Sequence, residues 1–145
     1  MNTVVLSDPS PEPSPQLIGD DLRAKAASVL ERFVDQFGGV GVRGAVISTA
    51  DGFDIAMTAM PEAEGTKLSA LSSSISAIGD MATLEVGIGN NHQSITIEGG
   101  DGYIFILNIP SAACPMILSV AASKEIMLGK LMYYARLVVE GMAEA

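Results

Sequence analysis

The chain has 145 residues, of which 48% are apolar and 17% are charged, and its formal net charge is −9. This length is typical of one domain, and the composition is that of a packed globular protein. Because no cluster of Lys or Arg interrupts the acidic balance, the attraction to phosphate on which DNA and RNA binding depends is missing, so we expect no nucleic-acid partner.

The cysteine count and the apolar runs bear on the cellular compartment. Cys114 is a single cysteine and cannot form an intrachain disulfide. The N-terminus lacks the basic and long apolar regions of a secretory signal, and no apolar run approaches the ~20 residues that a membrane helix needs. We therefore expect a cytoplasmic protein without a membrane span.

Residues 1–19 contain the run SDPSPEPSPQ, whose four prolines disfavour both helix and sheet. We predict a disordered Pro-rich tail, either a passive leader or a docking segment, followed by one domain over residues 20–145. From Asp20 or Asp21 the apolar residues recur at helical spacing, which predicts a helix that ends near Phe37 at the Gly38-Gly39 pair.

The next segments predict two hairpin strands, a helix and three further strands. The run VRGAVISTADGFDIAMTAM reads as two strands joined by a two-residue turn at Asp51-Gly52. A helix is expected from Pro61 to about Val86, and strands are expected at HQSITIE, at YIFILNI and from Cys114 to Ala122. Ser123 is a candidate N-cap for a final helix.

The resulting order is α-β-β-α-β-β-β-α. Hairpin connections indicate an antiparallel sheet, whereas the apolar character of both faces of the last two strands indicates helices on both sides of it. We predict a three-layer α/β/α sandwich around a five-stranded antiparallel sheet.

The helix predicted over residues 62–86 carries more apolar surface than one sheet contact requires. On a helical wheel, one apolar stripe holds Leu68, Leu71, Ile75, Ile78 and Ala82, and an adjoining stripe holds Ala63, Ala70, Ala77, Met81 and Leu84. Together they span about 200° of arc, whereas packing on one sheet needs only about 100°. The remaining face, with Ser69, Ser72, Ser73, Ser76 and Gly79, is small enough to let another helix approach.

We interpret this helix as an interface, which either meets another part of the same chain or pairs with a second copy. An antiparallel pair about a two-fold axis near Ser76 would bring Lys67 of one copy toward Glu85 of the other. The strand HQSITIE, if it lies at a sheet edge, is either a protected edge or extends the sheet across the same axis. The predicted interface residues are Lys67, Ala70, Leu71, Ser74, Ala77, Ile78, Met81, Glu85, Ser94 and Thr96.

Catalytic, metal and cofactor sites are not predicted. His92 is the single histidine and has no metal-ligand spacing to cysteine, and no serine lies in a G-x-S-x-G elbow. Cys114 is interpreted as a buried structural thiol, and Arg43 and Lys67 as solvated charges. The glycine groups GGVG, GIGNN and GGDG match no phosphate-binding motif and are interpreted as turns.

The segments VRGAVISTADGFDIA, KLSALSSSISAIGDMA, ITIEGGDGYIFILNI and LSVAASKEIMLGKLMYYAR resemble the Roadblock family, which includes dynein light chains and bacterial and archaeal regulators of Ras-like GTPases. The resemblance covers about residues 22–143. It implies a Roadblock/profilin-like fold, a homodimer built on the second helix and third strand, and binding to a Ras-like small GTPase. In some members GTP hydrolysis is stimulated, in the bacterial ones by reshaping the GTPase and not by inserting an arginine.

Three functions compete at this stage. The first is a non-catalytic, homodimeric GTPase regulator or scaffold, the second is a small-molecule sensor or generic protein-interaction domain of PAS or profilin-like architecture, and the third is an enzyme. An empty ligand-sized apolar pocket would favour the sensor. An exposed apolar patch spanning two protomers would favour the scaffold, and this is the expectation.

Overall fold

The computed structural model describes residues 18–111 and 113–143, and these form three helices and five strands. Along the chain they are α1 (Asp20–Asp35), β1 (Val42–Thr49), β2 (Asp54–Thr58), α2 (Glu62–Glu85), β3 (Ser94–Glu98), β4 (Gly102–Ile109), β5 (Met116–Ser123) and α3 (Leu128–Met142). The predicted order of elements is confirmed. Of the predicted tail, residues 1–17 lie outside the described residues, and Ile18 packs against the core.

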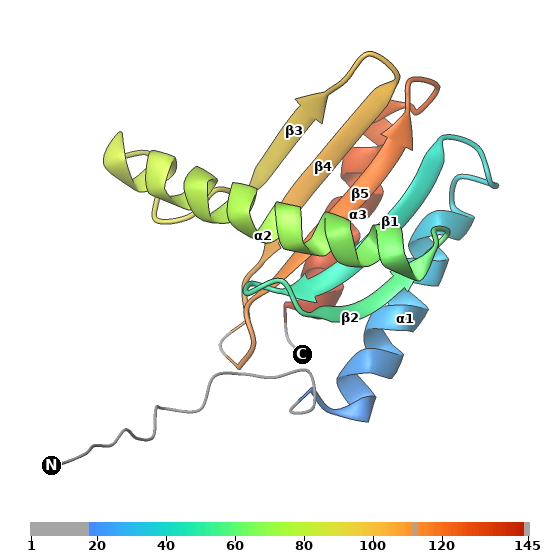
Figure 1. The fold of residues 1–145 in the computed structure, drawn as a ribbon, viewed down its shortest axis with the longest axis horizontal. Coiled ribbons are helices and arrows are strands. Elements are labelled where there is room, and N and C mark those ends of the chain that lie inside the picture. Colours follow the sequence, from blue (N-terminus) through green and yellow to red (C-terminus); the bar gives the residue numbers. More distant parts are fainter. Residues whose placement is uncertain (1–17, 112, 144–145) are drawn as a thin grey trace, which may run out of the picture.

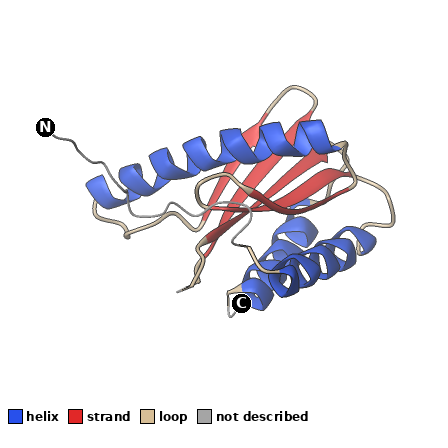
Figure 2. Cartoon of the chain, turned by 60° about the horizontal axis from the view of Figure 1, so that its bottom comes forward, coloured by secondary structure: helices blue, strands red, loops and turns tan. Residues whose placement is uncertain are grey.

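The five strands form one antiparallel sheet in the order β2-β1-β5-β4-β3 (Figure 1). Helices α1 and α3 lie together on one face of this sheet, and α2 crosses the other face (Figure 2). The predicted three-layer sandwich is therefore confirmed. Strands β2 and β3 are the two edges.

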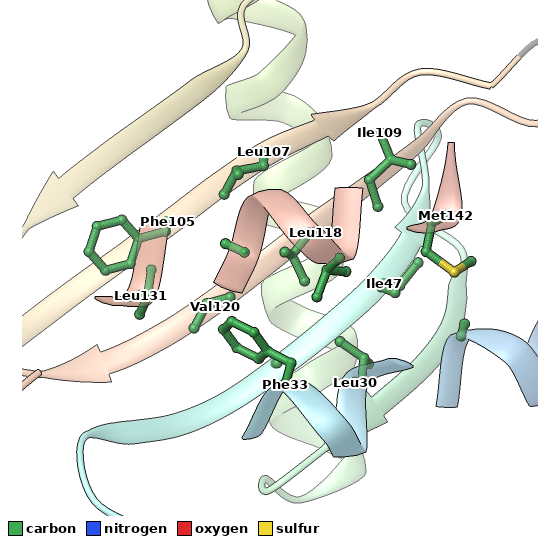
Figure 3. Packing of buried hydrophobic residues seen from close by; sticks show 14 of the residues in the cluster. Leu30, Phe33, Ile47, Phe105, Leu107, Ile109, Leu118, Val120, Leu131 and Met142 are labelled. Carbon is green, nitrogen blue, oxygen red and sulfur yellow. The ribbon is translucent and has the colours of Figure 1, made fainter. Parts of the chain in front are cut away.

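The main core lies between the sheet and the pair α1 and α3 (Figure 3). Alternate residues of β4 and β5 point into it, among them Phe105, Leu107 and Leu118, and α3 contributes Leu131, all at most 2% exposed. Neighbouring residues of the same strands point toward α2 and are also buried, as Ile106 and Ile117 show. Burial on both faces explains why these strands are apolar throughout.

One predicted turn differs from the structure, and another agrees with it. Strand β1 ends at Thr49 and β2 begins at Asp54, so the hairpin loop is longer than the two-residue turn expected at Asp51-Gly52, although Gly52 has the expected positive φ. Thr49 closes this loop, because its backbone and its Oγ1 both bond to the backbone of Phe53. After α1, Gly38 and Gly39 both have positive φ, which explains why the helix ends there.

The predictions at the start of β5 and α3 are partly wrong. Strand β5 begins at Met116, so Cys114 lies in the preceding loop, half-buried, and not in a strand. Ser123 is the last residue of β5 and not an N-cap, since α3 begins only at Leu128, after Met127. The Oγ of Ser123 instead accepts a hydrogen bond from the backbone N–H of Glu125 and so shapes the connecting turn.

Candidate protein interface

The side of α2 that packs on the sheet is its small-residue side. The buried residues of the helix are Gly65, Leu68, Ser69, Ser72 and Ser76. Of the apolar stripe that begins with Leu68, Leu68 itself is buried, whereas Leu71 and Ile78 are exposed, so most of that stripe does not contact the sheet. The prediction that the serine face is open to another helix is wrong, because the sheet of the same chain occupies it.

Close approach between α2 and the sheet explains this arrangement. A Cβ atom built on Gly65 would lie 2.5 Å from the Sδ of Met57 in β2, and one on Gly79 would lie 2.6 Å from the Cδ1 of Ile95 in β3. Ser73 also donates a hydrogen bond from its Oγ to the carbonyl of Ala50, 2.7 Å away. Small residues therefore sit where side chains of the sheet reach the backbone of the helix.

The outward side of α2 is apolar. Leu71, Ile78, Met81 and Leu84 are between 60% and 69% exposed, and Val86 and Ile88 just beyond the helix are exposed as well. An exposed apolar face of this extent is typical of an interaction surface. None of the described helices is long and apolar enough to cross a membrane.

The structure places the predicted interface residues on two neighbouring surfaces. Those of α2 are all exposed on its outward side: Lys67, Ala70, Leu71, Ser74, Ala77, Ile78, Met81 and Glu85. Ser94 and Thr96 lie on the edge strand β3, where they pair with Leu107 and Phe105 of β4 and so project toward the α1 and α3 side. Ile95 and Ile97 project from β3 toward the α2 side.

Helix α2 does not cover its face of the sheet evenly (Figure 1). It crosses near the end of β3 at which Ser94 lies, and its C-terminal end passes beyond the β3 edge. The opposite ends of the strands remain uncovered on this face. Ile97 is 37% exposed there, and its neighbours Ile104 and Ala121 are only half-buried.

A polar cluster joins α2 to β4 and to the loop before β3. The Oγ of Ser76 lies 2.7 Å from the Nε2 of His92 and 3.3 Å from the Oδ1 of Asn108. Asn108 donates from its Nδ2 to the Oδ1 of Asp80, 3.1 Å away, and to the His92 carbonyl, 2.6 Å away. The backbone N–H of His92 also donates to Asp80, at 3.0 Å.

Sequence reasoning missed this cluster. The sequence predicts His92 in a turn and the serines in a helix, but the loop after α2 folds back and buries the His92 ring against Ser76 and Gly79. Ser76 and His92 are 16 positions apart and belong to different elements, so no local pattern links them. The one available signal is that Ser76 and Asp80, four residues apart, share a helix face.

The pair Ser76 and His92 does not have the geometry of a catalytic dyad. Ser76 is only 3% exposed, and the Nδ1 of His92, which an orienting carboxylate would contact, is buried without a hydrogen-bond partner among the described residues. Burial lowers the pKa of His92 from its ordinary value, and the nearby Asp80 carboxylate opposes this only in part. The described residues hold no group of three or more His, Cys, Asp or Glu that could bind a metal.

An open groove of about 1230 Å³ runs beside the cluster, between the C-terminal ends of α2 and α3 and the loop joining β4 to β5. Its floor includes Leu107 and Ile109, and its walls carry Asp80, Arg136 and Glu140. The groove is open and mixed in polarity, unlike the enclosed apolar pocket expected of a small-molecule sensor.

Comparison with known proteins assigns the fold to a family. Residues 29–119 match the Roadblock/LC7 domain, which is well over half of the chain. The chain belongs to the Roadblock/LC7 family. No curated protein sequence matches it closely.

Three solved structures illustrate the shared fold. The gliding protein MglB from Thermus thermophilus has a TM-score of 0.75 and 20% identity, over 91% of this chain and 95% of that one. An MglB in a tetrameric arrangement has a TM-score of 0.76 and 21% identity, over 91% and 94%. A Roadblock/LC7 domain from Streptomyces avermitilis has a TM-score of 0.71 and 19% identity, over 79% and 91%.

Proposed function

We propose that the protein is a cytoplasmic homodimer that regulates or scaffolds a Ras-like small GTPase and has no catalytic chemistry of its own. The observation that carries the proposal is the exposed apolar side of α2, together with the overhang of its C-terminal end beyond β3 (Figure 1). Family membership supports the GTPase partner, and an MglB in a tetrameric arrangement supports self-association.

The overhang and the uncovered half of the sheet are complementary under a two-fold rotation. An axis perpendicular to the sheet beside β3 brings the covered end of one sheet to the level of the uncovered end of the other. Each overhanging α2 end then lies over the partner copy's uncovered strands, around Ile97 and Ile104. The two β3 edges meet in the same operation, which removes one unpaired edge from each copy.

The rotation of α2 about its own axis agrees with this arrangement. Its flank with Ser73 and Asp80 points toward the Ala50 loop and Asn108, as their hydrogen bonds require. The flank with Leu71 and Ile78, roughly opposite on a helix of ~3.6 residues per turn, therefore points toward the uncovered half of the sheet. A second α2 running antiparallel in that place would bury both side chains.

Charge favours a basic partner for the dimer. A formal net charge of −9 per chain steers cationic surfaces toward the dimer. The part of the outward α2 side that the second copy leaves open, including Met81 and Leu84, offers an apolar contact for the GTPase. The alternative of a small-molecule sensor has less support, because the groove beside His92 is open and polar at its walls.

Self-association is tested by sedimentation velocity at tens of micromolar. We expect a dimer, and we expect Ile78→Glu to give mostly monomer, because it places a charge in the apolar contact. Tyr133→Glu is the matched control: Tyr133 is 61% exposed on α3, on the other side of the sheet, and its variant should remain a dimer. A monomeric wild type, or equal effects of the two variants, contradicts the proposed dimer.

The GTPase partner is tested with the small GTPases of the same organism, each loaded with GDP or GTP. We expect the wild type and Tyr133→Glu to bind a GTPase in at least one nucleotide state, and Ile78→Glu not to bind. If the protein is a regulator, the wild type and Tyr133→Glu should also change the rate of single-turnover GTP hydrolysis. If no GTPase binds in either state while the protein is dimeric, the regulator is ruled out and a different scaffold role or the sensor is favoured.

A further inference from the structure

The polar cluster of Ser76, Asp80, His92 and Asn108 sits where α2 leaves the sheet. Before it, Gly65, Ser69 and Ser72 pack on the strands, whereas after it Met81, Ala82, Leu84 and Glu85 are exposed. Asp80 is thus the last residue of α2 whose side chain is held by hydrogen bonds to the sheet and to the loop before β3. The direction of the overhanging end depends on this anchor.

The hydrogen-bond donors and acceptors of the cluster indicate the protonation state of the His92 ring. The Nδ2 of Asn108 donates to Asp80 and to the His92 carbonyl, so its Oδ1 is left as an acceptor for the hydroxyl of Ser76. The Ser76 oxygen then accepts from the Nε2–H of His92. All the hydrogen bonds of the cluster form when the His92 ring is neutral with its proton on Nε2. The lone pair on Nδ1 then has no donor among the described residues.

Protonation of His92 breaks this arrangement. The added proton sits on Nδ1, a buried atom without an acceptor among the described residues, and an unpaired buried donor with charge is costly. The charged groups around the ring are Asp80 on α2, with its Oδ1 3.7 Å from Nε2, and Arg136 and Glu140 of α3 across the groove. Asn108 of β4 carries no charge. A charged ring gains most by moving toward Asp80 and solvent, which gives up the bond to Ser76.

We propose that His92 is a positioning residue for the α2 interface, and that its protonation releases the overhanging end of α2 so that self-association weakens as the pH falls. This inference rests on the proposed dimer. It assigns the chain a pH response in the range between about pH 7.5 and 5.5, where carboxylates do not titrate at their ordinary pKa values.

The chain offers a sharp test, because His92 is its single histidine. The dimer Kd is measured by sedimentation equilibrium at about pH 7.5 and about pH 5.5. We expect the wild-type Kd to rise at least about fivefold over this range. This is less than the roughly tenfold change in Kd that linkage to one proton gives over one pH unit. His92→Gln, whose amide can still donate to Ser76, should keep a tight dimer at both pH values. Ser76→Ala removes the acceptor, and should weaken the dimer already at the higher pH.

The outcomes separate this inference from the proposed function. A wild type that is monomeric at both pH values contradicts the dimer itself. A wild-type dimer whose Kd does not change with pH, or a His92→Gln dimer that keeps the full pH response, contradicts the role of His92. If His92→Gln fails to fold, the NMR titration of the wild-type ring decides, because its midpoint must coincide with the midpoint of the change in Kd.

Discussion

Cys114 is a half-buried thiol in the loop between β4 and β5. Its backbone N–H donates to the Oγ of Ser111, 3.3 Å away, which holds the loop. Burial raises the pKa of the Cys114 thiol above its ordinary value of 9.0, and the Asp51 carboxylate raises it further. Because the thiolate is the reactive form, the fold keeps this cysteine unreactive near neutral pH.

We therefore expect slow alkylation of Cys114 by iodoacetamide, with a rate that is still rising above about pH 9. Asp51→Asn removes the nearby negative charge, so the midpoint of the rate-against-pH curve should move to lower pH. Asp101→Asn, in the exposed turn between β3 and β4, is the matched control and should leave the curve unchanged. Equal curves for the wild type and Asp51→Asn would show that the carboxylate does not act on the thiol.

At the same scale, the sequence predicts exposed residues better than contacts. Spacing alone places Lys67, Ser74 and Glu85 together on one side of a helix, and the structure has them exposed on one side. The contact between Ser76 and His92 was not predictable, because it depends on how the loop after α2 turns back to β3. Periodicity encodes which way a residue of a helix faces, but not what it meets.

At the scale of elements, α2 packs in the reverse of the usual sense. Helices normally bury their apolar side and expose their polar side. Here the sheet takes Ser69, Ser72 and Ser76, while Leu71 and Ile78 are exposed. The sequence showed two apolar stripes and a serine face. Steric fit decided which face meets the sheet, because side chains such as Met57 and Ile95 reach the helix backbone and leave room only for small residues.

Ser72 tests this packing. It is 1% exposed, and its Oγ has no hydrogen-bond partner among the described residues. Ser72→Leu should lower the free energy of unfolding by about 1–3 kcal/mol, because the larger side chain does not fit between helix and sheet. Ser72→Ala should be neutral or slightly stabilising, since it removes an unpaired buried hydroxyl and Ala favours helix.

Urea unfolding measured at constant protein concentration gives these free energies. Ser28→Leu, at a position of α1 outside the core, is the control for adding a leucine to a helix and should change stability by less than about 0.5 kcal/mol. A Ser72→Leu variant as stable as the wild type would mean that this face of α2 is not tightly packed.

Over the whole molecule, the fold was predictable because its signals are local. The hairpin at Asp51-Gly52, the stop at Gly38-Gly39 and the doubly apolar strands each act over a few residues, and together they define the order and the layers. The order of strands in the sheet and the overhang of α2 are set by long-range packing, and neither followed from the sequence. In the proposed dimer, the overhang makes the apolar face of α2 complementary to the uncovered strands of a second copy.

The register of the two α2 helices in the proposed dimer is tested through charge. Lys67 and Glu85 lie at equal distances along α2 from Ser76, so an antiparallel pair centred at Ser76, as predicted from the sequence, places each Lys67 near the partner copy's Glu85, twice per dimer. A pair centred where α2 leaves β3, after Gly79, does not bring these two residues together. Lys67→Glu and Glu85→Lys should each raise the dimer Kd several-fold at low salt, because exposed pairs contribute about 0.2–1 kcal/mol each and reversal adds repulsion. The double variant restores opposite charges, so its Kd should return close to that of the wild type.

Arg43→Glu changes the net charge by the same amount as Lys67→Glu, at a position near the start of β1 that lies outside the core, and controls for general repulsion between acidic chains. All differences should shrink in high salt, since exposed charges are screened. A double variant in which the two effects simply add would rule out contact between these residues. The helices would then have to pair about a different point, or not at all, whereas a restored Kd would fix both the antiparallel direction and the register of α2.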